Sequence, residues 1–334
     1  VLALSVTIAG LFQFVFIYIR IRHLNIRLIL SKPKISKHVK KFFRLLFPNL
    51  LAGGVVQINQ FVGVVFAASI PGAISWLYYA DRIVQLPLGI FIITISTILL
   101  TSLSSPNVQK NLNNMNSKIE KSIEIILAVS LLSCIGLFIL SDLIVDILFK
   151  RGQFGYGDVK ATSAAIVMYA YGLPAFGLIK IFSTIFFSHQ DTKTPFRVSF
   201  FSMILNIIGI FFFIKDFGHL GIALALSLAS WINAFVLYIF IHFKGYWRMN
   251  FSFLKKIIKL IIVFIASLNV VNFLEYFIVF FDLVDTSTFF KKILFLSYLI
   301  ILSVTTFILF CIIFRILSIK DLSRKKLNKF FKEY

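Results

Sequence analysis

Two side chains of opposite charge stand next to each other inside an apolar segment of this sequence. Asp81 and Arg82 follow directly after Trp76-Leu-Tyr-Tyr-Ala80, in a stretch from 76 to 104 that is otherwise suited to lipid. An ionisable residue at such a position costs several kcal/mol unless it faces a watery cavity or a partner, so it marks a candidate functional site. The alternative is that both charges lie near a helix end and snorkel to the lipid headgroups.

The spacing within this segment predicts how its polar groups are presented. Asp81 and Gln85 are four residues apart and share one helix face, whereas the adjacent Asp81 and Arg82 diverge by about 100°. We therefore place Asp81, Arg82 and Gln85 among the candidate binding residues, together with the neighbouring Tyr79.

Further polar groups interrupt the apolar segments on either side. The segment 45–70 contains Gln57 and Asn59, buried amides that need hydrogen-bond partners and that suit a substrate cavity or a hinge. A packing seam between helices is the alternative for these amides. Pro87 and Gly89 should kink the segment that carries the charges, as is typical of transporters that rock between two states.

One lysine, Lys180, lies within the apolar segment 161–187, about two turns from its end. Lys180 is a candidate for the same cavity, although a side chain of this length could also reach water at the membrane surface.

The composition excludes an ordinary soluble globule. The mean hydropathy is +0.95, with 59% hydrophobic and 14% charged residues, which is typical of an all-α polytopic membrane protein. We expect about nine spans, over the ranges 2–19, 45–70, 76–104, 122–140, 161–187, 196–214, 220–243, 257–281 and 293–314.

The basic residues predict the orientation of these spans. Of the 34 Lys and Arg residues, 25 fall in or next to one alternate set of connecting segments, counting the C-terminal tail, and six fall in the other set. The positive-inside rule then places the first loop, Arg20–Arg44, and the C-terminus in the cytoplasm. The net charge of +21 is explained by topology, so we expect no nucleic acid partner.

The expected orientation puts Val1 on the outer side, and the chain begins without Met on an apolar run. We therefore treat the sequence as a fragment of a longer protein. Cys134 and Cys311 lie far apart in apolar runs, and the five histidines show no ligand spacing. With no phosphate-binding loop, dinucleotide fingerprint or nucleophile elbow, we expect no catalytic residues, no metal and no cofactor.

Several motifs resemble those of the MurJ (MviN) lipid II flippases, a family of the multidrug/oligosaccharidyl-lipid/polysaccharide exporter superfamily that also holds the MATE transporters. The motifs are Trp76-Leu-Tyr-Tyr-Ala-Asp-Arg-Ile-Val-Gln-Leu-Pro-Leu-Gly89, Gln57-Ile-Asn59, Leu148-Phe-Lys-Arg-Gly-Gln-Phe154, Tyr171-Gly-Leu-Pro-Ala175 and Phe187-Ser-His-Gln-Asp-Thr-Lys-Thr-Pro195. The resemblance is specific between about 44 and 197, weaker to about 243, and mainly hydropathic beyond.

The resemblance implies a MurJ/MATE-like helical bundle with fourteen helices, of which this chain would supply helices six to fourteen. We expect the end of an N-terminal lobe and a basic cytoplasmic linker over 1–44, and the C-terminal lobe over 45–243. Two extra helices with a groove for a lipid tail are expected over 244–318, and a basic cytoplasmic tail over 319–334.

The implied function is to flip lipid II, the undecaprenyl-pyrophosphate-linked peptidoglycan precursor, to the outer leaflet of the bacterial inner membrane for cell-wall synthesis. Arg82 would face the central cavity and bind the anionic headgroup, with Asp81 beside it. Gln85 stands where some relatives carry Glu. The expected partners are lipid II, membrane lipids and the missing N-terminal helices. The alternatives are a flippase for another polyprenyl-linked oligosaccharide of the O-antigen type, or an inactive remnant.

Overall fold

The computed structural model describes residues 2–23, 37–105, 112–280 and 288–316, and every regular element within these ranges is a helix. The chain divides into two compact units, residues 1–44 and 45–334, which are described separately below. The basic tail expected over 319–334 lies outside the described residues.

The first unit contains α1 (Leu2–His23) and the first turns of α2 (Lys37–Ala67). α1 is apolar over most of its length and carries its charges at the end. The guanidiniums of Arg20 and Arg22 lie 5.9 and 5.6 Å from the ring centroids of Phe16 and Tyr18, one turn earlier. These pairings suit a helix end at a membrane surface.

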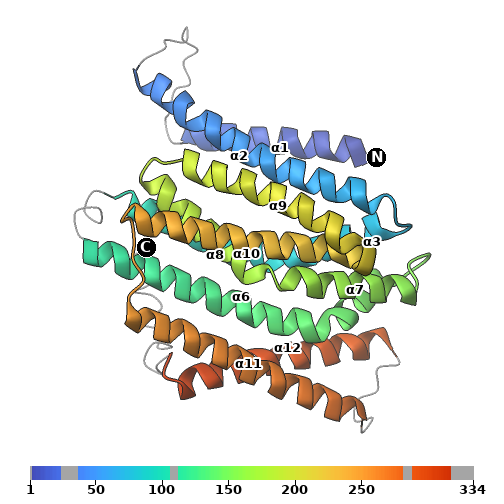
Figure 1. Ribbon diagram of the computed structural model, residues 1–334. Coiled ribbons are helices and arrows are strands. Elements are labelled where there is room, and N and C mark those ends of the chain that lie inside the picture. The colour runs from blue at the N-terminus through green and yellow to red at the C-terminus, as the bar shows by residue number, and fades with distance from the viewer. Residues whose placement is uncertain (1, 24–36, 106–111, 281–287, 317–334) are drawn as a thin grey trace. The chain divides into compact units, whose positions relative to one another are not determined.

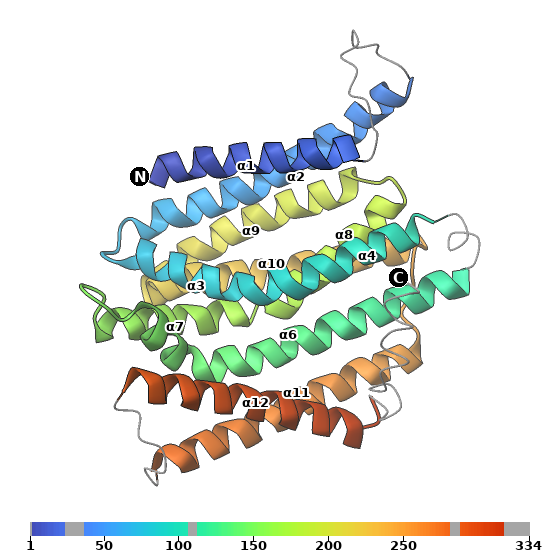
Figure 2. The same ribbon diagram turned by 180° about the vertical axis from the view of Figure 1, so that it is seen from behind.

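The second unit is a helical bundle arranged about its longest helix, α6 (Leu112–Phe149). The pair α11–α12 lies on one side of α6 and its two helices cross, while the other helices of this unit lie on the opposite side (Figures 1 and 2). After α2, the remaining elements are α3 (Ala73–Pro87), a π-helical turn η1 (Leu88–Ile92), α4 (Ile93–Leu103), α7 (Tyr156–Ala170), α8 (Leu173–Ser188), α9 (Lys193–Phe217), α10 (His219–Phe243), α11 (Phe251–Phe280) and α12 (Phe289–Ile313).

Six helices among the described residues are long and apolar enough to cross a membrane, or seven if α7 and α8 form one span. The expected count of nine is not confirmed. The expected spans 2–19 and 45–70 are helical in α1 and α2, but only the shorter apolar stretch Gln57–Ala67 is found in the latter. The expected span 161–187 is two helices bent by 42°, because Pro174 lacks the N–H that a continuous helix needs.

Most of the core of the second unit lies in two large hydrophobic clusters. The α4–α8 cluster gathers buried residues such as Leu99 and Ile181, and the α3–α7 cluster gathers others such as Leu77 and Ile166. Since lipid tails are as apolar as these side chains, close van der Waals packing is the term that holds the helices together.

Ionic contacts fix the α11–α12 pair to α6 near opposite ends of that helix. Lys256 at the start of α11 lies 3.5 Å from Glu124, and Lys292 at the start of α12 bonds to Asp146. Phe295 and Leu299 of α12 pack with Leu140 in a small cluster of their own. The pair is therefore part of the second unit and rests on a single long helix.

Trp76 ties together the starts of three helices. Its indole N–H donates to Asp158 Oδ1 at 2.7 Å, and Asp158 also accepts the Gly155 N–H at the start of α7. The indole packs against His219, the first residue of α10, with ring centroids 4.9 Å apart and the ring planes tilted by 59°. These contacts, which we call the Trp76 clamp, hold the first turns of α3, α7 and α10 together.

Asp191 joins the C-terminal ends of α8 and α10. Its carboxylate accepts hydrogen bonds from Lys244 Nζ at 2.5 Å and from the Thr194 hydroxyl at 2.7 Å. Burial raises the pKa of the Asp191 carboxyl, but the hydrogen bonds from Lys244 and Thr194 and the Lys244 charge outweigh it and hold the pKa below its ordinary value.

We expect the stability that Asp191 contributes to depend on pH in the acid range. A lowered folded-state pKa stabilises the fold above the ordinary aspartate pKa, near 3.8, and this stabilisation is lost as the pH falls through the folded value. Asp191→Asn should therefore lower the free energy of unfolding by up to about 1 kcal/mol at neutral pH. Thermal unfolding in detergent should show the difference shrinking below about pH 4; a difference that is constant with pH would contradict the assignment.

Candidate functional site

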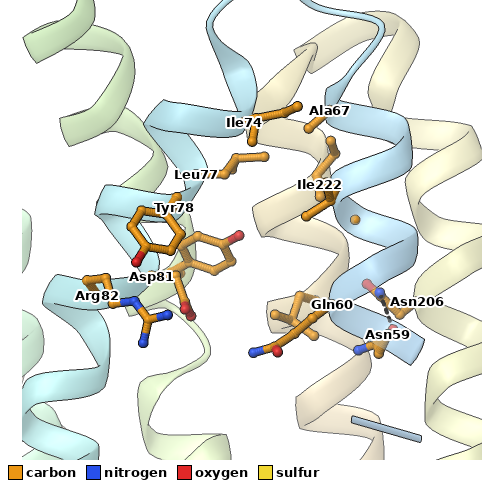
Figure 3. Close-up of a pocket in the computed structure, with 14 residues that line it drawn as sticks. Asn59, Gln60, Ala67, Ile74, Leu77, Tyr78, Asp81, Arg82, Asn206 and Ile222 are labelled. Carbon is orange, nitrogen blue, oxygen red and sulfur yellow. Dashed lines mark hydrogen bonds between the residues drawn. The ribbon is translucent and has the colours of Figure 1, made fainter. Parts of the chain in front are cut away.

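A cavity of about 280 Å³ opens within the second unit, between α3 on one side and α2, α9 and α10 on the other (Figure 3). The residues that line it are Asn59, Gln60, Gly63, Val64, Ala67, Ile74, Leu77, Tyr78, Asp81, Arg82, Tyr169, Asn206, Ile222 and Leu226.

The charged wall of the cavity is one face of α3. Tyr78 stands four residues after Ile74, three before Asp81 and four before Arg82. Helix geometry brings residues at these spacings to the same side. Figure 3 shows Tyr78, Asp81 and Arg82 together on this helix, across the cavity from Gln60. The local sequence alone is enough to produce this wall.

Gln85 connects the two charges of this wall. Its amide donates to the Asp81 carboxylate, four residues earlier, and its Oε1 accepts from Arg82 Nη1 at 3.4 Å. The Arg82 guanidinium also lies 4.8 Å from the ring centroid of Tyr78, in a cation–π arrangement. One weak hydrogen bond leaves most of the five N–H donors of Arg82 available to a ligand.

The facing wall is built from amides of α2 and α9. Asn206 Nδ2 donates to Asn59 Oδ1 at 2.7 Å, and Figure 3 shows this bond to the right of Gln60. Asn206 is only 3% exposed, and its Oδ1 has no partner among the described residues. An acceptor without a partner at a cavity wall can receive a hydrogen bond from a ligand or from water. Tyr169 of α7, also buried, completes the lining.

The structure brings some of the candidate residues together and separates others. Asp81, Arg82 and Asn59 line the cavity, and Gln85 is bonded to the first two. Gln57 and Lys180 are exposed and lie outside the lining. Tyr79 also lies outside it.

The ring of Tyr79 packs against Phe149 and Phe154, with centroids 4.4 and 5.7 Å apart. These contacts hold Tyr79 on the end of α6 and the segment that follows it, outside the cavity lining. Tyr78, four residues before Arg82, is the tyrosine of this pair that lines the cavity.

Other lining residues carried weaker signals. Gln60 follows Gln57 by three residues in the same polar stretch, and its exposed side chain reaches the cavity. Asn206 is a single amide in the apolar segment 196–214, and it both bonds to α2 and lines the cavity. Tyr169 carries no local signal, because only the packing of α7 on α3 brings it here.

These groups are suited to binding a charged, hydrogen-bonding ligand. The cavity offers one guanidinium, one carboxylate and a wall of amides, a set that can hold an anionic, hydrogen-bonding headgroup. Across the described ranges, no three His, Cys, Asp or Glu side chains are grouped so as to hold a metal ion.

A family model and curated proteins similar to this chain carry the same description. The family model described as lipid II flippase MurJ matches residues 1–299. The probable lipid II flippase MurJ of Rhizobium meliloti (strain 1021) is 34% identical over 261 residues, which cover 78% of this chain and 49% of the relative. The probable lipid II flippase MurJ of Rickettsia prowazekii (strain Madrid E) is 36% identical over 237 residues, covering 71% and 47%. The chain thus spans about half the length of these curated relatives.

Solved structures agree in fold. A structure described as lipid II flippase MurJ in an inward closed conformation matches with a TM-score of 0.67 at 27% identity, covering 85% of this chain and 56% of that one. An outward-facing MATE family transporter of the MOP superfamily matches with a TM-score of 0.51 at 16% identity, covering 80% and 62%, which shows likeness of fold alone.

We expect the Asn59–Asn206 bond to contribute a measurable coupling energy. In a double-mutant cycle, Asn59→Ala and Asn206→Ala should couple by about 0.6 kcal/mol, with an upper bound of about 1.7 kcal/mol, as hydrogen bonds between membrane helices do. The measurement is the free energy of unfolding in detergent. Asn59→Ala with Asn233→Ala, a buried asparagine that is not bonded to Asn59, is the matched control and should give no coupling. Equal coupling in both cycles would contradict a specific bond.

Proposed function

This chain belongs to the lipid II flippase MurJ family, and we propose that it supplies one wall of the cavity through which the complete protein flips lipid II. The resemblance expected from the motifs is confirmed by the family match. In the proposed mechanism the headgroup enters the cavity from the cytoplasmic side, and alternating access presents it to the outer leaflet. The polyprenyl tail remains in the lipid throughout.

The observation that carries this proposal is the position of Arg82. Its guanidinium lines the cavity, and within the described part of the chain its side-chain hydrogen bond is a single long one, to Gln85. A planar guanidinium matches two oxygens of a pyrophosphate at once, and such charge-assisted bonds are strong where water is scarce. The Asp81 carboxylate accepts its hydrogen bond from the neutral Gln85 amide, which supports a role for Arg82 in binding an anion.

The amide wall would bind the uncharged part of the same headgroup. Gln60, Asn59 and the unpartnered Asn206 oxygen offer donors and acceptors opposite Arg82, as sugar hydroxyls and peptide amides require. We propose Tyr78, which already contacts Arg82, as the aromatic residue of the site in place of Tyr79. Gln57, Tyr79 and Lys180 are outside the proposed site.

The remaining features of the proposal concern the membrane. The charge distribution supports a multi-pass inner-membrane protein with its C-terminus in the cytoplasm. The apolar surfaces of α11 and α12 would accommodate the polyprenyl tail, and N-terminal helices of the same protein would supply the opposite wall of the cavity. A flippase for an O-antigen lipid would use Arg82 in the same way, because both cargoes carry a pyrophosphate.

Replacing Arg82 should weaken lipid II binding strongly. Loss of charge-assisted hydrogen bonds of about 1.5–3 kcal/mol corresponds to roughly ten- to hundred-fold weaker binding in Arg82→Ala. Arg82→Lys should retain part of the affinity, since an ammonium keeps the charge but cannot form the bidentate fork. The measurement is native mass spectrometry of the complete protein with lipid II and an O-antigen lipid in competition.

Arg197→Ala is the matched control, because Arg197 is exposed on α9 and lies outside the cavity lining. It should bind lipid II as the unaltered protein does. Unchanged lipid II retention in Arg82→Ala would overturn the assigned role. Preferential retention of the O-antigen lipid would favour that cargo instead.

A further inference from the structure

Two spans of the second unit are interrupted midway, and the interruptions are built differently. α3 and α4 are joined by the π-helical turn η1, and α7 and α8 by a bend of 42°. A break in a membrane helix frees backbone groups that must find partners, because the hydrocarbon offers none. The origin of those partners distinguishes a fixed break from a movable one.

The α7–α8 bend is held by its neighbours. Pro174 disrupts the helix there, and side chains of α6 and α10 donate to the freed carbonyls. Ser227 bonds to Met168 O at 2.7 Å, Cys134 to Ala170 O at 3.1 Å, and Trp231 to Tyr171 O at 2.9 Å. Any change of the bend angle would break bonds to two other helices.

Packing at the same bend leaves no room for movement. A Cβ added to Gly172 would lie 2.8 Å from Ser227 Oγ and 3.0 Å from Ser227 Cα, a backbone atom. Five residues on, a Cβ on Gly177 would lie 2.5 Å from the Ile126 side chain. The bend is therefore both bonded and closely packed.

Among the described residues, the hydrogen bonds of the turn between α3 and α4 all lie within its own span. The Ile93 N–H donates to Leu88 O, five residues back, and Pro87 has no N–H to give. Side-chain hydroxyls that bond to carbonyls of this turn come from α4 itself. Thr94 donates to Ile90 O at 2.8 Å and Ser96 to Ile92 O at 2.7 Å.

One face of this turn is exposed in the described part of the chain. Gly89 is exposed, and a Cβ added to it would meet no atom within 4 Å. Leu86 and Ile90 on either side are 58% and 61% exposed. Hydrogen bonds within the span and the absence of atoms near a Gly89 Cβ leave the exposed face of this turn able to change shape, while Ile92 on its other face stays buried in the α4–α8 cluster.

The core divides at the same turn. α3 packs on α7 in the α3–α7 cluster, α4 packs on α8 in the α4–α8 cluster, and Leu88 contacts both clusters. A π-helical turn contains an extra residue relative to an α-helix, and such turns are frequent at functional sites.

We infer that the π-helical turn Leu88–Ile92 is a movable joint within this unit, whereas the α7–α8 bend is fixed. The Trp76 clamp and the packing of α3 on α7 hold α3 in place, so movement at the joint changes the direction of α4 relative to α3. The inference concerns motion inside this unit and does not depend on the cargo.

Distances between spin labels placed on both sides of each break test this inference in the complete protein in lipid nanodiscs. The native Cys134 and Cys311 are buried and stay in place. The label pairs, all at exposed positions, are Ser75 with Thr101 across the joint, Tyr156 with Lys180 across the fixed bend, and Phe200 with Phe212 in the unbroken helix α9. Each pair is measured by pulsed electron resonance with and without lipid II.

We expect the 75–101 distances to be broad or bimodal and the 156–180 distances to be as narrow as the 200–212 reference. Gly89→Ala should reduce the population of conformers that depart from a regular helix at Leu88–Ile92 roughly five-fold. The reason is that alanine favours a regular helix over glycine by about that factor. Gly136→Ala, in unbroken α6 and also without atoms near its added Cβ, is the matched control and should leave the distribution unchanged.

Two results would overturn the joint. One is a 75–101 distribution as narrow as the reference both with and without lipid II. The other is a broader distribution across the α7–α8 bend than across the α3–α4 turn. Neither result would bear on lipid II binding through Arg82, which the substitution of that residue tests separately.

Discussion

A positive charge within an apolar layer is the constraint on which this structure depends. Arg82 is tolerable there because a tyrosine ring, a glutamine amide and an open cavity replace part of the water it would otherwise need. Five helices are positioned so that this cavity exists. The Trp76 clamp sets where α3 begins relative to α7 and α10, and the Asn59–Asn206 bond joins the two helices of the facing wall.

Much of the charged wall could be predicted from sequence because it is local. The four-residue spacing of Asp81 and Gln85 predicted a shared face, and the hydrogen bond between them confirms it. Pro87 and Gly89 were expected to kink this segment, and the structure has a π-helical turn there, Leu88–Ile92. All of these features follow from helix geometry over three turns.

Features set by packing could not be predicted in the same way. Two adjacent tyrosines look equivalent in sequence, and only the aromatic contacts of Tyr79 with Phe149 and Phe154 show which of the two faces away from the cavity. The segment 161–187 is apolar on average despite Lys180, so hydropathy cannot distinguish one span from two bent helices. Side chains more than fifty residues away in α10 complete that bend by bonding to its carbonyls.

The local character of the network around Arg82 also bears on how the chain enters the membrane. Tyr78, Asp81, Arg82 and Gln85 lie within about two turns of a single helix, so their contacts form as soon as that helix does. The helices that bring Tyr169 and Asn206 are synthesised later, since chains emerge from the N-terminus. During that interval α3 carries its own partners for both charges, and its insertion need not wait for the rest of the cavity.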